Sequence, residues 1–434
     1  MDYYTITLII LIIPLIIASY LHHRHVTLKV ERASAAESGR LDMIDDEIHD
    51  IDHDSTGNRY YNFRNKFLWV YGLAMAAEWL QASYLYSCLK NTHKLSEPAI
   101  ATLFATGFVS AGISALFVDS LANKHGKRSM CQYYCLVYSA SCLTTLAGNV
   151  IVLFAGRVMA GFCTTLLYSA FESWMTAEYK RQGFGDRGTA LSTIYSMMAV
   201  INGIVSAGSG IVAQAAVSAL GSHTAPFLLS IVCLSFALVV ITRSWAENRG
   251  TSGRPPLAET SWKANAISLL KDPSLVILTL TVCFFEGSVY VVLYSWPQTI
   301  MSSRFHERIW ANPPFGTIFS SLTAAMSLGS FMFLYTSRDA NSIQVSSRTI
   351  QLASSISASA LLSAILLRDE SSRFWAFCVF EICAGLYYPS MAYLKSRVTQ
   401  EERRGRVYGL MMRRYVANHD PMLRIIGIVA YERI

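Results

Sequence analysis

Residues 149–188 read NVIVLFAGRVMAGFCTTLLYSAFESWMTAEYKRQGFGDRG, and this stretch decides how the rest of the chain is interpreted. It is apolar and exceeds the roughly 20 residues that a helix needs to cross a bilayer. A charge at membrane depth costs several kcal/mol unless it faces a partner or water. At about 100° per residue, one side of the helix carries Arg157, Gly161, Thr164, Tyr168 and Glu172. We therefore expect this polar stripe to face a pore that the rest of the chain surrounds.

The composition is that of a membrane protein. Of 434 residues, 53% are hydrophobic and only 15% are charged, whereas an average soluble domain has about 25% charged residues. The net charge of +7 does not indicate nucleic acid, because Lys and Arg stand in short clusters between apolar runs. The nine cysteines form no CxxC pair and no metal-ligand spacing, so we expect buried apolar side chains rather than ligands or disulfides.

The amino-terminal region has two parts. The first apolar run, Tyr3 to Leu21, is interrupted by Pro14. A signal peptide would begin with positive charge and have a shorter apolar core, so we expect a retained helix instead. Residues 22–62 follow as a polar linker whose middle reads DMIDDEIHDIDHD. A metal site is the alternative there, but the EF-hand spacing is absent, which favours a solvated acidic segment.

Ten further apolar segments have lengths suited to spanning helices. They cover residues 65–88, 98–120, 130–148, 150–176, 189–216, 225–243, 274–296, 314–336, 349–367 and 374–394. Every second connection is rich in Lys and Arg, and the connections between these carry two basic residues or none. By the positive-inside rule the rich connections are cytoplasmic, which places the 22–62 linker inside and Met1 outside.

A weak internal repeat is visible. Residues 78–87 and 286–295 each begin with Glu and end with Tyr-Ser, with Leu before the Tyr. The fourth and tenth segments each contain a glycine in mid-helix and lead into a basic loop with Arg-Gly. Two copies of a six-helix unit would give this pattern, and parallel halves with substrate at their interface describe one large class of secondary transporter.

The loop from Asp119 to Arg128, DSLANKHGKR, resembles a loop of the major facilitator superfamily. An acid at a helix end, a glycine in a tight turn and a basic pair can latch neighbouring helices in one gate state. The expected latch consists of Asp119, Gly126, Lys127 and Arg128, with an ordinary positive loop as the alternative. Gly-Arg-x-x-x-Gly, around Arg157, also resembles a motif of that superfamily.

Ionisable groups inside the apolar segments are the candidate transport residues. Arg157 is always charged, so it needs an acid or an anionic ligand. Buried carboxylates can carry protons, or they can pair with Arg157 or cap backbone groups, and both alternatives stay open. Polar side chains on the same faces complete the set. The candidates are Glu78, Gln81, Arg157, Tyr168, Glu172, Asn202, Glu286, Tyr290, Glu381, Tyr388 and Lys395.

Catalytic motifs are absent from the sequence: there is no Walker loop, GxSxG, HExxH or kinase signature. We expect no enzyme activity and no metal or nucleotide cofactor.

Four segments are similar to the molybdate-anion transporter family of the major facilitator superfamily. They are AEWLQASYLY at Glu78, GRVMAGFCTTLLYSAFESWMTAE from Gly156, FFEGSVYVVLYSWPQ at Glu286 and FEICAGLYYPSMAYLKSRV at Glu381. FGTIFSSLTAAMSLGS, residues 315–330, resembles its eighth core helix, and the resemblance covers about residues 60–410. The family also carries an extra amino-terminal helix.

The resemblance implies an all-α polytopic membrane protein with two six-helix pseudo-repeats that takes up molybdate, a tetrahedral dianion, by alternating access. Arg157 is then the main anion ligand, with Lys395, Tyr168 and Asn202 as helpers, and proton coupling through one glutamate is a hypothesis. The plasma membrane is the expected location, with lipid and a small anion as partners. The rivals are transport of a sugar, drug or organic anion, and a receptor or scaffold that moves nothing.

The end of the chain departs from the family pattern. After residues 406–411 the family continues into two more spanning helices, whereas here the chain reads RRYVANHDPMLRIIGIVAYERI. We expect a second half without its last two helices, because of truncation or a gene model that read into an intron. The expected divisions are an amino-terminal helix (1–21), an acidic linker (22–62), a first bundle (63–243), an inter-bundle loop (244–273), an incomplete second bundle (274–412) and an atypical tail (413–434).

Overall fold

The computed structural model describes residues 3–20, 24, 49–184, 191–248, 273–306, 312–336 and 343–398. These residues are almost entirely helical, and no strand occurs among them. Eight of the described helices are long and apolar enough to cross a membrane, or nine if one bent pair counts as a single span. The expected all-α polytopic fold is confirmed.

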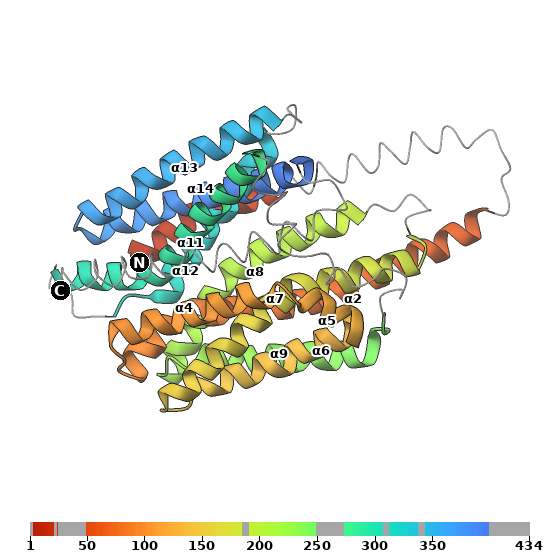
Figure 1. Ribbon diagram of the computed structural model, residues 1–434, viewed down its shortest axis with the longest axis horizontal. Coiled ribbons are helices and arrows are strands. Elements are labelled where there is room, and N and C mark those ends of the chain that lie inside the picture. Colours follow the sequence, from red (N-terminus) through yellow and green to blue (C-terminus); the bar gives the residue numbers. More distant parts are fainter. Residues whose placement is uncertain are drawn as a thin grey trace.

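The helices form two bundles (Figure 1). The first contains α2 (His49–Ala82), α3 (Leu85–Ser87), the π-helical turn η1 (Cys88–Thr92), α4 (Glu97–Ser114), α5 (Val118–His125), α6 (Lys127–Thr144), α7 (Val150–Arg181), α8 (Leu191–Leu220) and α9 (Ala225–Ser244). The second contains α11 (Pro273–His306), α12 (Phe315–Thr336), α13 (Ile343–Leu366) and α14 (Glu370–Val398).

Local sequence explains where the central helices begin. Asn149 precedes α7 in an extended conformation, and its side-chain oxygen accepts a hydrogen bond from Ile151 N at 2.8 Å. This satisfies one of the backbone donors that a helix start leaves unpaired. α9 begins with Pro226 in its first turn, where the missing backbone N–H is not needed.

Three boundaries differ from the expectation. α2 begins at His49, so the last part of the 22–62 linker is already helical and continuous with the first bundle. The first segment breaks at Ser83–Tyr84, and the second bends by 57° between α4 and α5. No proline stands at either break, so apolar length alone could not reveal them. The Ser83 hydroxyl donates instead to Leu80 O at 3.1 Å within the last turn of α2.

The amino-terminal helix, Tyr3–Tyr20, packs against the second bundle although it precedes the first in sequence (Figure 1). One of its sides is buried through Tyr4, Leu8, Leu11 and Leu15, at a spacing of three or four residues, while its isoleucines other than Ile12 are exposed. Tyr4 donates a hydrogen bond to Glu370 at the start of α14, and Glu370 also pairs with Arg304 of α11 at 2.6 Å. This polar contact holds the helix to α11 and α14.

The two bundles meet mainly where α8 lies against α12. A Cβ placed on Gly210 would lie 2.4 Å from the Gly316 carbonyl oxygen, and one on Gly316 would lie 2.2 Å from the Gly210 oxygen. Only glycine allows backbones to approach so closely in a membrane bundle. Gln214 Oε1 accepts a bond from Gly316 N at 3.1 Å beside this contact.

Several expected divisions cannot be placed. Most of the linker, most of the inter-bundle loop from residue 249, and the chain from residue 399 to the end lie outside the described residues. The expectations about the basic Arg-Gly loops and about the tail therefore stay predictions.

Candidate functional site

Glu78 of α2 is the centre of a polar cluster inside the first bundle. The Thr164 hydroxyl of α7 donates a hydrogen bond to Glu78 Oε1 at 3.1 Å. Tyr138 of α6 lies close to the same carboxylate. Arg157 lies within the electrostatic reach of Glu78 but not within ion-pair distance. The other Glu78 oxygen, Oε2, is buried and has no hydrogen-bond partner.

Arg157 is held without a direct partner. Its guanidinium lies over Gly107 of α4, where an added Cβ would come within 3.3 Å of Nη2. The side chain is half-buried, and Nε is buried with no hydrogen-bond partner. Arg157 makes no hydrogen bond or ion pair with any residue that the structure describes. A guanidinium offers five donors in a planar fork and does not deprotonate, so it has the chemistry to bind an anion.

The second bundle contains its own buried charge pair. Lys395 Nζ of α14 lies 3.5 Å from Glu286 Oε1 of α11, and both side chains are largely covered. Tyr388, seven residues before Lys395, lies within the electrostatic reach of Glu286 and of Glu381. Glu381 is half-buried and makes no hydrogen bond or ion pair within the described residues. Lys395 and Tyr388 of α14 therefore both lie close to Glu286 of α11.

The two clusters come near each other where the bundles meet, and Tyr290 links them; we call this region the central space. Tyr290 of α11 lies within the electrostatic reach of both Glu286 and Glu78, which belong to different bundles. Its ring packs on Phe108 of α4, with the ring centroids 4.3 Å apart. Tyr168 of α7 is half-exposed and close to Glu78 and Tyr290. Two cations, several carboxylates and three tyrosines thus surround one region.

Three other predicted residues are hydrogen-bonded within the protein. Gln81 is buried and its amide donates to Ala77 O of its own helix at 3.1 Å. Asn202 of α8 accepts a bond from the Trp79 indole at 2.8 Å, beside Phe319 of the second bundle. Glu172 is exposed, and Tyr195 donates to it at 2.9 Å. These three side chains already have protein partners.

The α7 stripe does not face the space along its whole length. Gly161 is buried against α4, where a Cβ would lie 2.2 Å from the Gly107 carbonyl oxygen. Helical periodicity placed Gly161 on the polar side, but a glycine there serves the close approach of two helices.

The predicted latch makes its contacts within the first bundle. Asp119 accepts a hydrogen bond from Ser169 of α7, and Lys127 Nζ donates to Ser173 O at 3.2 Å. The Arg128 guanidinium donates to Thr242 O of α9 at 2.7 Å. Gly126 has φ +101°, a conformation that glycine adopts readily. The loop therefore ties α6 to α7 and α9.

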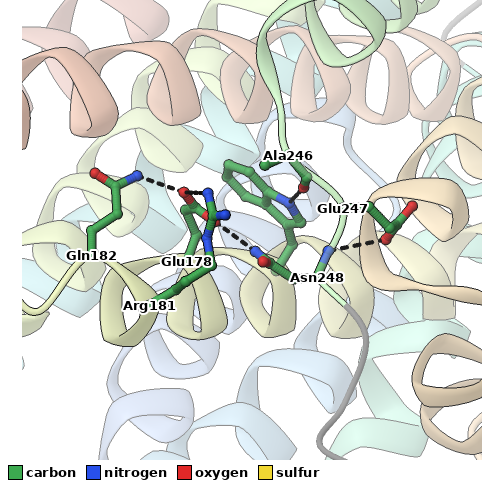
Figure 2. A network of polar contacts seen from close by, with 7 residues as sticks. Glu178, Arg181, Gln182, Ala246, Glu247 and Asn248 are labelled. Carbon is green, nitrogen blue, oxygen red and sulfur yellow. Dashed lines mark hydrogen bonds and ion pairs between the residues drawn. The ribbon is translucent and has the colours of Figure 1, made fainter.

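Sequence reasoning missed the residues that continue this latch. After α9, Glu247 accepts bonds from Arg128 N at 3.1 Å and Ser129 N at 3.2 Å, which caps the start of α6. Asn248 donates to Glu178 near the end of α7 at 2.7 Å. Figure 2 shows Glu178 at the centre of this network, with Arg181, Gln182 and Asn248 around it. No sequence pattern marks an acid three residues beyond a helix as a cap for a distant helix.

Sequence reasoning also missed the side chains around the Gly210–Gly316 contact between the bundles, which we call the outer contact. Tyr84 donates to Gln214 Oε1 at 2.7 Å, the same atom that accepts from Gly316 N. Ser87 Oγ is hydrogen-bonded at 3.0 Å to Nδ1 of His223, which lies in the turn between α8 and α9. Burial of the His223 ring lowers its pKa. The glycines and small residues of residues 206–210 were the available signal.

The described parts of the chain contain no candidate metal site. There, no three His, Cys, Asp or Glu side chains come together in a group that could hold a metal ion. All nine cysteines are free thiols, and eight of them are buried. The arrangement suits the binding and passage of a charged solute.

Comparisons with known proteins identify the family of the chain. Residues 30–375 match a major facilitator family model described as sugar transporters with twelve transmembrane segments. The molybdate-anion transporter of Xenopus tropicalis is 29% identical over 349 residues, which are 79% of this chain and 74% of that protein. The molybdate-anion transporter of Takifugu rubripes is 27% identical over 379 residues, covering 80% of this chain and 76% of that protein.

Solved structures share the fold. The nucleoside transporter NupG superposes with a TM-score of 0.61 at 12% identity, over 82% of this chain and 88% of that one. A bacterial homologue of the human lysosomal transporter Spinster, inward-facing and unoccupied, superposes with a TM-score of 0.61 at 13% identity, over 82% and 79%. The chain is therefore a multi-pass membrane transporter, not an enzyme, and it belongs to the molybdate-anion transporter family of the major facilitator superfamily.

Proposed function

We propose that this protein takes up molybdate, a small oxyanion, by alternating access between its two bundles. The observation that carries the proposal is the Arg157 guanidinium, which is fixed inside the first bundle without a direct partner among the described residues. An intramembrane charge of this kind is costly and marks a substrate pathway. A tetrahedral dianion supplies the acceptor oxygens that the guanidinium fork needs.

Lys395 is the second cation of the proposed site. It reaches the central space from the second bundle, so an anion between the bundles can contact both positive charges. The Tyr290, Tyr168 and Tyr388 hydroxyl groups add donors around the same space. An anion that binds in this way engages both bundles, as alternating access requires.

Proton coupling resolves the excess of carboxylates beside a dianion. Glu286 is balanced by Lys395, whereas Glu381 has no cationic partner among the described residues. A protonated Glu381 would remove one repulsive charge when the anion enters, and its proton would travel with the anion. Uptake should then acidify the cytosol and respond to an imposed pH gradient, and Glu381→Gln should abolish that response. Wild-type uptake that ignores the gradient would refute the coupling.

The outer contact supports alternating access. By the positive-inside rule, Gly210 and Gly316 lie in the outer halves of α8 and α12. Their close approach, with the Tyr84–Gln214 bond beside it, is the contact that we assign to a closed outer side. Separation of these glycines would open it.

A neutral sugar is the second candidate substrate. The description of the matching family model and the aromatic side chains around the space favour it. Competition distinguishes the candidates: cells that express the protein should take up molybdate, and tungstate and sulfate should compete whereas hexoses should not. Competition by hexoses alone would favour the sugar. We further propose the plasma membrane as the location, which surface labelling of intact cells tests.

A further inference from the structure

A pocket separate from the central space lies near the expected cytoplasmic end of the first bundle. Its volume is about 310 Å³. One wall is a single face of α2 that carries Arg59, Asn62 and Lys66, at a spacing of three or four residues. The opposite wall is the end of α7, and the segment that follows α9 closes the third side.

The pocket carries an excess of positive charge. Glu178 is the one carboxylate among its lining residues, and it is occupied by Arg181, at 2.6 Å, and by Gln182 and Asn248 (Figure 2). Arg59 and Lys66 are exposed and form no ion pair with any described residue. Two uncompensated cations therefore face the pocket from α2.

The floor of the pocket is aromatic and rigid. Trp174 and Trp245 stack with ring centroids 3.6 Å apart and ring planes 10° apart. The Trp174 indole N–H donates to Ala246 O at 2.9 Å, which fixes the segment after α9 against α7. This floor needs no ligand to form, so a ligand would not have to order the floor when it binds.

The pocket lies where the lipid-facing surface ends. On α9 the exposed apolar stripe runs through Leu228, Val232, Phe236 and Val239 and stops just before the pocket residue Ser244. On α2, Trp69 lies one turn from Lys66 and is 75% exposed. Exposed Trp side chains and basic residues occur together at membrane–water interfaces. The pocket is thus within reach of a lipid headgroup.

We propose that this pocket binds the phosphate headgroup of an anionic phospholipid of the cytoplasmic leaflet. Arg59 and Lys66 supply the charge, and the Asn62 amide supplies a further donor for phosphate oxygens. The headgroup joins α2 to the network at the end of α7, so the lipid stabilises the first bundle at its cytoplasmic end.

The test measures lipid retention on the purified full-length protein. In nanodiscs of phosphatidylcholine with a minor fraction of phosphatidylserine, native mass spectrometry should show preferential retention of phosphatidylserine. Each basic residue near an anionic surface contributes about a factor of five, so Arg59→Gln with Lys66→Gln should weaken retention about 30-fold. Arg64→Gln is the matched control. It removes the same charge from the same helix, but its side chain lies 4.8 Å over the Tyr61 ring rather than lining the pocket.

Three outcomes would overturn the proposal. They are equal retention of the two lipids, equal loss in the Arg64→Gln control, and an unchanged preference in the double variant. A further arm separates the possible sources of phosphate. Inorganic phosphate, titrated into the protein in pure phosphatidylcholine nanodiscs, should not match phosphatidylserine in raising the unfolding temperature. If it does so, the pocket binds soluble phosphate and the lipid assignment is wrong.

Discussion

Substitution of Gly210 by alanine should hold the outer side of the transporter open. A Cβ at this position would lie 2.4 Å from the Gly316 carbonyl oxygen and 2.4 Å from Ser320 Oγ. Ordinary contacts begin near 3.4 Å, so α8 and α12 must separate by about 1 Å. That movement weakens the bond from Gly316 N to Gln214, now 3.1 Å long.

The expected magnitude follows from two costs. Overpacking of a tight contact costs about 1–3 kcal/mol, and loss of one hydrogen bond costs about 1 kcal/mol. The outer-closed state therefore loses about 2–4 kcal/mol, which lowers its population relative to the outer-open state by about 30- to 1,000-fold.

The assay is labelling from outside intact cells with a membrane-impermeant maleimide, in a protein that carries Tyr290→Cys in the central space. Adding Gly210→Ala to the Tyr290→Cys protein should make labelling at least tenfold faster. The Gly210→Ala protein that keeps Tyr290 should have lost transport. Gly208→Ala is the matched control, because it lies on the same helix and its Cβ would meet no atom within 4 Å. Equal labelling rates in the two alanine variants would refute the gate.

Three further predictions follow from the structure. Gly126→Ala places a Cβ 2.4 Å from Glu247 Oε1 at φ +101°, so it should lower the free energy of unfolding by about 1–3 kcal/mol, and a wild-type unfolding temperature would contradict this. Tyr4→Phe removes a donor to the buried Glu370 carboxylate and should cost about 1–2 kcal/mol, measured by unfolding in detergent, with exposed Tyr20→Phe as a control without effect. Burial lowers the pKa of His223 from its ordinary 6.5, so the unfolded chain binds more protons than the folded chain near and below pH 6.5. The free energy of unfolding should therefore decrease as the pH is lowered from 7.5 to 5.5, and it should decrease less in His223→Asn.

Helix positions were predictable because apolar length and charge are properties of single segments. Each predicted span in the described region is helical, including the amino-terminal one, although the first is broken at Ser83–Tyr84 and the second is bent between α4 and α5. The spans α2 and α6 fall short of the hydropathy of the other spanning helices because they carry polar side chains such as Arg64 and Lys127. Their burial against neighbours, which one sequence does not display, compensates for that polarity.

The site was predictable only in part. Intramembrane charges pointed to Arg157, Glu78, Glu286 and Lys395, because their cost in lipid makes them rare. Pairing was not predictable, since Lys395 meets Glu286 whereas Arg157 stays without a direct partner among the described residues. Contacts between distant helices decide such pairings.

The contacts between helices that are distant in the sequence could not be predicted for the same reason. The Gly210–Gly316 approach joins two helices about a hundred residues apart. The cap that Glu247 places on α6 likewise depends on how the chain turns after α9. Small residues indicate that a close contact exists but not which helix provides it.

Equilibrium dialysis of molybdate against the purified protein tests the central claim most directly. Wild-type protein should bind saturably, and Arg157→Ala should weaken binding at least tenfold, because a charge-assisted contact to a dianion contributes more than about 1.4 kcal/mol. Arg157→Ala combined with Glu78→Gln removes the carboxylate that would be left without a nearby cation, so it should keep the wild-type unfolding temperature and still fail to bind. Molybdate binding that is unchanged in the folded double variant would contradict the account.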